Sequence, residues 1–213
     1  RRSSDLTIPM EPFVIATEVC SATQNIFIRI HTDEGIVGMG ECSAFPMLVG
    51  ETQNTCFEIA KHFGRITKGL DPLNTIGILS LLDQYIAFNS TIKSAWDIAL
   101  HDLAAKSMGL PLFAFLGGTK KDIHTDLTIG IDTPEKMAEK AKQYVANGVT
   151  IIKVKLGKNG EEDVRRIKLI REAVGYSIQL RVDANQGWEM ETAIKTLNAI
   201  APYEIEFCEQ PIH

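Results

Sequence analysis

Four charged side chains in the last third of the sequence have the types and spacing for proton-transfer chemistry. Lys153 and Lys155 lie in IIKVKLG, Asp183 lies in LRVDANQGW and Glu209 lies in EFCEQPIH. Lys155 and Asp183 are 28 positions apart, and Asp183 and Glu209 are 26 apart. One strand and one helix with their loops take about 30 residues in a (β/α)8 barrel. These residues are therefore predicted at equivalent points of successive parallel strands, on the rim where such barrels build active sites.

The alternation of side chains along each strand supports a shared inner face. Lys153 and Lys155 point to one side of their strand, because side chains at i and i+2 share a face, and Arg181 and Asp183 do the same in the next strand. The third strand mixes polar and apolar residues on both faces.

The residue types favour removal of a proton next to a carboxylate. Asp183 and Glu209 could supply two oxygen ligands to a hard cation such as Mg²⁺. A neighbouring ammonium disfavours the charged form of a lysine. Lys155 could then act as a base while the metal holds the resulting enediolate.

Three motifs resemble the muconate-lactonizing-enzyme subgroup of the enolase superfamily: KVK at 153–155, DANQGW at 183–188 and EQP at 209–211. This resemblance implies that Lys155 is the catalytic base on one face of the substrate and that Lys153 lies near the substrate carboxylate. It also implies that Asp183 and Glu209 ligate Mg²⁺. DLTIGIDTPE at 126–135 is similar to the first barrel strand of dipeptide epimerases, where Thr128 would bind substrate.

The resemblance implies an isomerase that epimerises a dipeptide with two bases on opposite faces of the α-carbon. Two alternatives use the same scaffold, namely an N-acylamino acid racemase and a lyase of the muconate cycloisomerase or o-succinylbenzoate synthase type. A third is a non-enzymatic remnant of the fold. Acidic residues on later strands would favour the dipeptide over the other substrates.

Charge and composition limit the classes of molecule that the protein could bind. The 213 residues carry a formal net charge of −5 with no basic block, which argues against nucleic-acid binding. No apolar run approaches the ~18 residues of a membrane span, and the N-terminus lacks the apolar region of a secretory signal. Four scattered cysteines without a CxxC motif indicate reduced thiols in a cytoplasmic protein. We expect a small-molecule substrate (a dipeptide or an N-acyl amino acid), no nucleic acid and no membrane, and leave a homo-oligomer open.

The first part of the chain predicts a capping domain over residues 1–115. Three strands are expected at 12–19, 24–31 and 36–42, as an antiparallel meander with a turn at Thr32–Gly35. TDEGIVGMGE in this part resembles the capping domain of the same superfamily. Residues 20–24 and 43–50 are predicted as loops, which in the family close over the barrel mouth. Helices are expected at 51–67, 75–87 and 91–107, the last with an apolar stripe at helical spacing.

Residues 122–213 predict the first four strands of a TIM-type barrel. Strands at 124–131, KVK, DAN and EQP alternate with three helical segments, which is the pattern of a parallel sheet. An open half barrel would leave an unpaired edge strand, so we expect the first half of a longer chain. The third metal carboxylate and the second lysine are expected beyond residue 213, and the 213-residue segment alone is predicted to be inactive.

Overall fold

The computed structural model describes residues 4–213, which form two compact units. One unit takes the start of the chain up to Pro9 together with Ala22–Lys121, and the other takes Met10–Ser21 together with Asp122–His213. In the described residues no helix combines the length and apolar character needed to cross a membrane.

The N-terminal sheet is a three-stranded meander, as predicted. Its strands are β1 (Ser4–Val14), β2 (Val19–His31) and β3 (Val37–Ser43), in the order β1-β2-β3, with β2 and β3 antiparallel. The boundaries of the first hairpin were predicted wrongly. Ile15 to Glu18 form its turn, closed by a 3.0 Å hydrogen bond from Ile15 N to the Glu18 carbonyl, and residues 20–24 belong to β2. Pairing with β1 holds this polar segment extended, although it lacks an apolar alternation.

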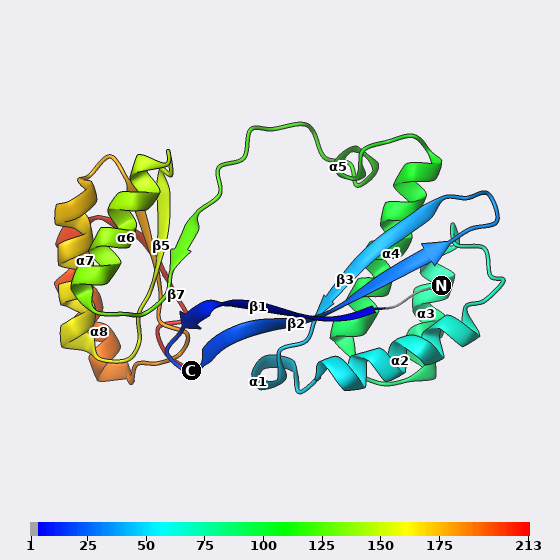
Figure 1. Cartoon of the computed structure of the whole chain (residues 1–213), viewed down its shortest axis with the longest axis horizontal. Helices are drawn as coiled ribbons and strands as arrows, with labels where there is room; N and C mark the ends of the chain where they lie inside the picture. The colour runs from blue at the N-terminus through cyan, green and yellow to red at the C-terminus, as the bar shows by residue number, and fades with distance from the viewer. Residues whose placement is uncertain (1–3) are drawn as a thin grey trace. The chain divides into compact units, whose positions relative to one another are not determined.

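Five helices accompany this sheet: α1 (Pro46–Val49), α2 (Gln53–Ile66), α3 (Thr75–Tyr85), α4 (Ser90–Ser107) and α5 (Leu112–Phe115). Helix α4 lies against β3 (Figure 1). Gly38 and Gly40 permit this close approach, since a Cβ at Gly40 would lie 1.9 Å from the carbonyl oxygen of Ala95 and one at Gly38 would lie 2.1 Å from that of Ala99. The predicted loop at 43–50 contains the short helix α1.

A buried carboxylate meets the N-terminus of α4. Glu51 accepts hydrogen bonds from the Thr91 amide at 3.3 Å, the Ser90 hydroxyl at 3.2 Å and the Cys56 thiol at 3.3 Å. Asn89 occupies the capping position, but its side chain donates to the Ala87 carbonyl instead. A residue 40 positions away in sequence therefore performs the capping of this helix.

The second unit contains a parallel sheet in the order β4-β5-β6-β7, as predicted for the first part of a barrel (Figure 1). Its elements are β4 (Leu127–Ile129), α6 (Pro134–Ala146), β5 (Ile151–Lys155), α7 (Gly160–Val174), β6 (Gln179–Asp183), α8 (Met190–Ile200), the 3-10 turn η1 (Ala201–Tyr203) and β7 (Ile205–Glu209). The apolar face of the sheet packs in a core with α6, α7 and α8 through Ile152, Val154, Leu180 and Val182, all fully buried.

The turn of the first hairpin belongs to this second unit. The Val14 carbonyl accepts a 2.8 Å hydrogen bond from the Ile131 amide just after β4. Added Cβ atoms at Gly157 and Gly187 would come within 2.9 and 2.7 Å of the Ala16 methyl group. The turn thus packs on the loops that follow β5 and β6.

Candidate functional site

The parallel sheet aligns the predicted residues in rows across its inner face. Lys155, Asp183 and Glu209 are in register at the C-terminal ends of β5, β6 and β7. Lys153 lies one row earlier, beside Thr128 on β4. The register that the spacing predicted is therefore present.

Four of the five predicted residues contact one another directly. Lys155 Nζ lies 2.7 Å from Asp183 Oδ2, and Lys153 Nζ lies 3.1 Å from the same oxygen. Lys153 Nζ also lies 2.6 Å from Glu209 Oε2. Thr128 is in the adjacent strand, and among the described residues its side chain forms no hydrogen bond with these four.

These contacts shift the pKa values of Lys153 and Asp183 and so favour their charged forms. Burial disfavours the charged form of Lys153, but its hydrogen bonds to Glu209 and Asp183 outweigh burial and raise its pKa above the usual lysine value. Burial also opposes the charge of Asp183, whose side chain is 1% exposed. Donation by Lys155, the Asn185 amide and Lys153 outweighs this effect and lowers the pKa of Asp183. Asp183 is therefore an anion that contacts the side-chain nitrogens of both lysines.

Asn185 is a site residue that the sequence analysis did not identify. Its side-chain oxygen accepts from Lys155 Nζ at 3.0 Å, and its amide donates to Asp183 Oδ1 at 2.9 Å. Its φ of 45° lies in the left-handed region, which Asn tolerates better than most residues. The DAN motif carried this signal, because an Asp side chain often accepts from the amide two residues further on and Asn tolerates a positive φ there.

A second ionic cluster is centred on Arg181, which is in register with Lys153 on the neighbouring strand. Arg181 Nε lies 2.6 Å from Glu206 Oε2, and its Nη1 lies 2.9 Å from Asp126 Oδ2. The pairing of β6 with β7 contains an extra β7 residue between the pairs Leu180–Ile205 and Val182–Cys208. Such a bulge reverses the alternation of side chains, which explains the mixed pattern of the EFCEQ strand.

The carboxylates also fit a divalent cation. The Lys153 ammonium lies between oxygens of Asp183 and Glu209, so a positive charge already bridges the two groups at the strand ends. Hard cations such as Mg²⁺ prefer carboxylate oxygens. No group of three or more metal-ligating side chains is present in residues 4–213. Asp183 and Glu209 are the two carboxylates that Lys153 brings together at this rim.

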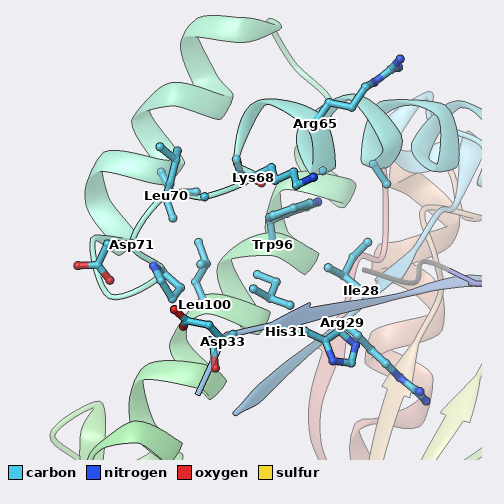
Figure 2. A pocket seen from close by; sticks show the side chains of 18 of the residues that line it. Ile28, Arg29, His31, Asp33, Arg65, Lys68, Leu70, Asp71, Trp96 and Leu100 are labelled. Carbon is cyan, nitrogen blue, oxygen red and sulfur yellow. The ribbon is translucent and has the colours of Figure 1, made fainter. Parts of the chain in front are cut away.

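A separate cavity of about 1070 Å³ lies within the first unit (Figure 2). Buried Ile28, Trp96 and Leu100 line its apolar part, and exposed Arg65 and Lys68 line its border. The buried indole Nε1 of Trp96 has no hydrogen-bond partner among the described residues. All five predicted site residues lie elsewhere, in the second unit.

Sequence comparison agrees with the fold. Residues 3–117 match the N-terminal domain of the mandelate racemase/muconate lactonizing enzyme family, and residues 136–213 match the family described as enolase C-terminal domain-like. The chain belongs to the mandelate racemase/muconate lactonizing enzyme family of the enolase superfamily.

Within this family the chain is similar to dipeptide epimerases. It is 50% identical to the D-Ala-D/L-Ala epimerase of Cytophaga hutchinsonii over 95% of this chain and 55% of that protein. It is 41% identical to the hydrophobic dipeptide epimerase of Enterococcus faecalis over 95% of this chain and 57% of that protein. The crystal structure of the Cytophaga hutchinsonii dipeptide epimerase with Mg and D-Ala-L-Val superposes with a TM-score of 0.95 and 47% identity, covering 99% of this chain and 58% of that one. The chain thus spans little more than half the length of these relatives.

Proposed function

We propose that the protein containing this chain is a Mg²⁺-dependent dipeptide epimerase. Residues 1–115 are assigned to its capping domain and residues 122–213 to the first four strands of its barrel. The contact of Lys153 and Lys155 with one buried carboxylate, Asp183, carries this proposal, since it joins two lysines and the two proposed metal-binding carboxylates on one rim. The similarity to dipeptide epimerases supports the substrate class.

Lys155 is proposed as the base that removes the α-proton from one face of the dipeptide, giving an enediolate. Asp183 and Asn185 hold its Nζ at 2.7 and 3.0 Å, which fixes where the proton is received. Lys153 is proposed to bind the substrate carboxylate, because its raised pKa keeps it cationic. Thr128, in the neighbouring strand, is proposed to contact the substrate.

Asp183 and Glu209 are the proposed Mg²⁺ ligands of this chain. The bound cation would stabilise the negative charge that develops on the substrate carboxylate as the proton leaves. Lys153 contacts one oxygen of each of these carboxylates, so its ammonium lies beside the position where Asp183 and Glu209 would hold the cation.

The proposal is tested with the complete gene product that contains these residues. Epimerisation is followed as deuterium incorporation at the α-carbon of alanyl and hydrophobic dipeptides in D₂O. Removal of Mg²⁺ with EDTA should abolish exchange, and Lys155→Ala should lower turnover by 10²–10⁴-fold or more while Mg²⁺ binding, measured by calorimetry, persists.

The matched control is Lys158→Ala, an exposed lysine in the loop after the same strand. This variant should retain turnover. Near-normal formation of the other epimer by Lys155→Ala, or equal losses in both variants, would reject Lys155 as the base.

Residues 1–213 alone are proposed to lack this activity. They contain one of the two bases and two carboxylate ligands, whereas inversion at the α-carbon requires a donor on each face. The same D₂O assay on the isolated segment should give no epimer. Measurable epimerisation would refute this proposal.

A further inference from the structure

A fully buried carboxylate, Asp163, lies near the start of α7. Its exposed fraction is 0%. Asp163 Oδ2 accepts from the Gly157 amide and from the Trp188 indole Nε1, both at 2.9 Å, and Oδ1 accepts from Arg166 Nη1 at 2.7 Å. A buried charge is costly unless it is paired and hydrogen-bonded. Asp163 meets this condition only while the three partners remain in place.

Arg166 extends the same network to a third loop. Its Nε donates to the Asp132 carbonyl at 3.0 Å, and its Nη2 lies 2.8 Å from Glu162. Asp132 follows β4, Gly157 follows β5 and Trp188 follows β6. The Asp163–Arg166 pair therefore binds the loops after three successive strands, all at the rim that carries the candidate site.

Two of these loops are also in close contact with each other. A Cβ at Gly157 would lie 2.2 Å from the Ala184 carbonyl, and one at Gly187 would lie 2.3 Å from the Gly157 carbonyl. Lys155 precedes Gly157 by two residues, and Ala184 follows Asp183 directly. The contact between these loops therefore lies within two residues of Lys155 and directly beside Asp183.

We propose that the buried Asp163–Arg166 pair is a positioning device that holds the loops after β4, β5 and β6 together and thereby sets the geometry between Lys155 and Asp183. Neither residue reaches the substrate side of the sheet, because both lie on α7 behind the strands. The catalytic consequence rests on the proposed function, whereas the anchoring of the loops does not.

The chain offers a matched control on the same helix. Arg171 is also buried, and it donates to the carbonyls of Gly175, Ile178 and Tyr203. These carbonyls lie before β6 and β7, at the opposite end of the sheet. Changes at this end of a barrel affect stability rather than catalysis. Arg171→Lys therefore measures what is lost when a buried arginine that does not contact the catalytic rim is changed.

The first measurement is amide hydrogen exchange in the complete protein. Loss of one stabilising hydrogen bond corresponds to about tenfold faster exchange. Asp163→Asn should accelerate exchange by at least this factor at residues 156–158 and 184–188, and Arg171→Lys should not. Trp188→Phe is the milder variant, since it keeps the ring and removes only the indole donor; it should accelerate exchange at 184–188. Unchanged exchange at both segments in Asp163→Asn would show that Asp163 does not hold the loops. If that variant does not fold, unchanged exchange at 184–188 in Trp188→Phe would show the same.

The second measurement is steady-state kinetics on the same variants under conditions where each is fully folded. Asp163→Asn should lower kcat by 10–100-fold, the usual cost of losing support behind a metal-site residue, with a smaller change in KM. Arg171→Lys should keep kcat within about threefold of the parent enzyme. Equal losses of kcat in the two variants would overturn the positioning role. If the parent protein shows no epimerase activity, the proposed function fails. Hydrogen exchange then still tests whether the Asp163–Arg166 pair holds the loops together.

Discussion

Asp183 is the side chain through which the two lysines of the candidate site are connected. It accepts from two lysines and from the Asn185 amide although it is almost fully buried. Breaking a buried ion pair by removing one partner costs about 3–5 kcal/mol, because the other charge is left uncompensated. The site therefore depends on all of these groups being present together.

Cys208 lies directly before Glu209 and offers a chemical measure of burial and negative charge at this end of the strand. Burial, followed by the charges of Asp183 and Glu209, raises its pKa to about 11. Because the thiolate is the reactive form, alkylation at pH 8 should be about a hundredfold slower than for a thiol with a pKa near 9. The rate should rise about tenfold per pH unit towards pH 11.

Peptide mapping after timed iodoacetamide treatment in EDTA measures this rate at Cys208. The same protein unfolded in urea is the control, since its thiol regains an ordinary pKa. Rapid labelling of the native protein at pH 8 would contradict the described environment.

At the element scale, the contact between β3 and α4 depends on two glycines. Gly40→Ala would place a methyl group 1.9 Å from the Ala95 carbonyl, so strand and helix must separate. Overpacking of this kind costs about 1–3 kcal/mol, and the urea midpoint should fall accordingly. Met39→Ala is the control, since Met39 is 40% exposed on the same strand. Equal midpoints for the two variants would disprove the close approach.

The N-terminus of α4 gives a second prediction at this scale. Glu51→Ala removes the acceptor for the Thr91 amide and the Ser90 hydroxyl. Loss of a helix cap costs about 0.5–2 kcal/mol, so the free energy of unfolding should decrease by this order. Glu58→Ala, at an exposed position on α2, should leave the urea midpoint unchanged. A similar midpoint for both variants would show that Glu51 does not cap the helix.

The strands and helices that could be predicted from the sequence are those whose own residues alternate or repeat with the period of that element. The KVK and DAN strands, with helices of regular period between them, allowed the parallel order and the register of Lys155 with Asp183 to be predicted. The strand at residues 20–24 was missed, because pairing with β1 stabilises it and its own side chains do not alternate. The β7 bulge was seen only as a mixed pattern, since a bulge is defined by the partner strand.

The buried polar groups were the hardest to predict. Asp163 reads in the sequence as one of three acids at the start of a helix, and such acids usually interact with the helix dipole in solvent. Its indole partner lies 25 positions further along the chain. Composition and periodicity describe neighbours along the chain, so they do not reveal a carboxylate whose partners come from other loops.

At the scale of the whole molecule, the second unit is discontinuous in sequence. It needs Met10–Ser21 as well as Asp122–His213. Residues 122–213 alone should lack a cooperative urea transition, because Ile131, Gly157 and Gly187 lose their contacts with the hairpin turn. Trp188 is the tryptophan of this segment and reports the transition by fluorescence.

A fusion of Met10–Ser21 to residues 122–213 through a flexible Gly/Ser linker is the matched comparison. It should show a sharper transition than residues 122–213 alone. Identical transitions with and without the hairpin segment would contradict its membership of this unit.

The place of the hairpin turn also has a consequence during synthesis on the ribosome. Ala16 emerges among the first residues, yet Gly157 and Gly187, on which it packs, are translated much later. At 5–20 residues per second this interval is on the order of ten seconds. The segment Met10–Ser21 therefore lacks these packing partners until the loops after β5 and β6 have been made, and the second unit cannot be completed before then.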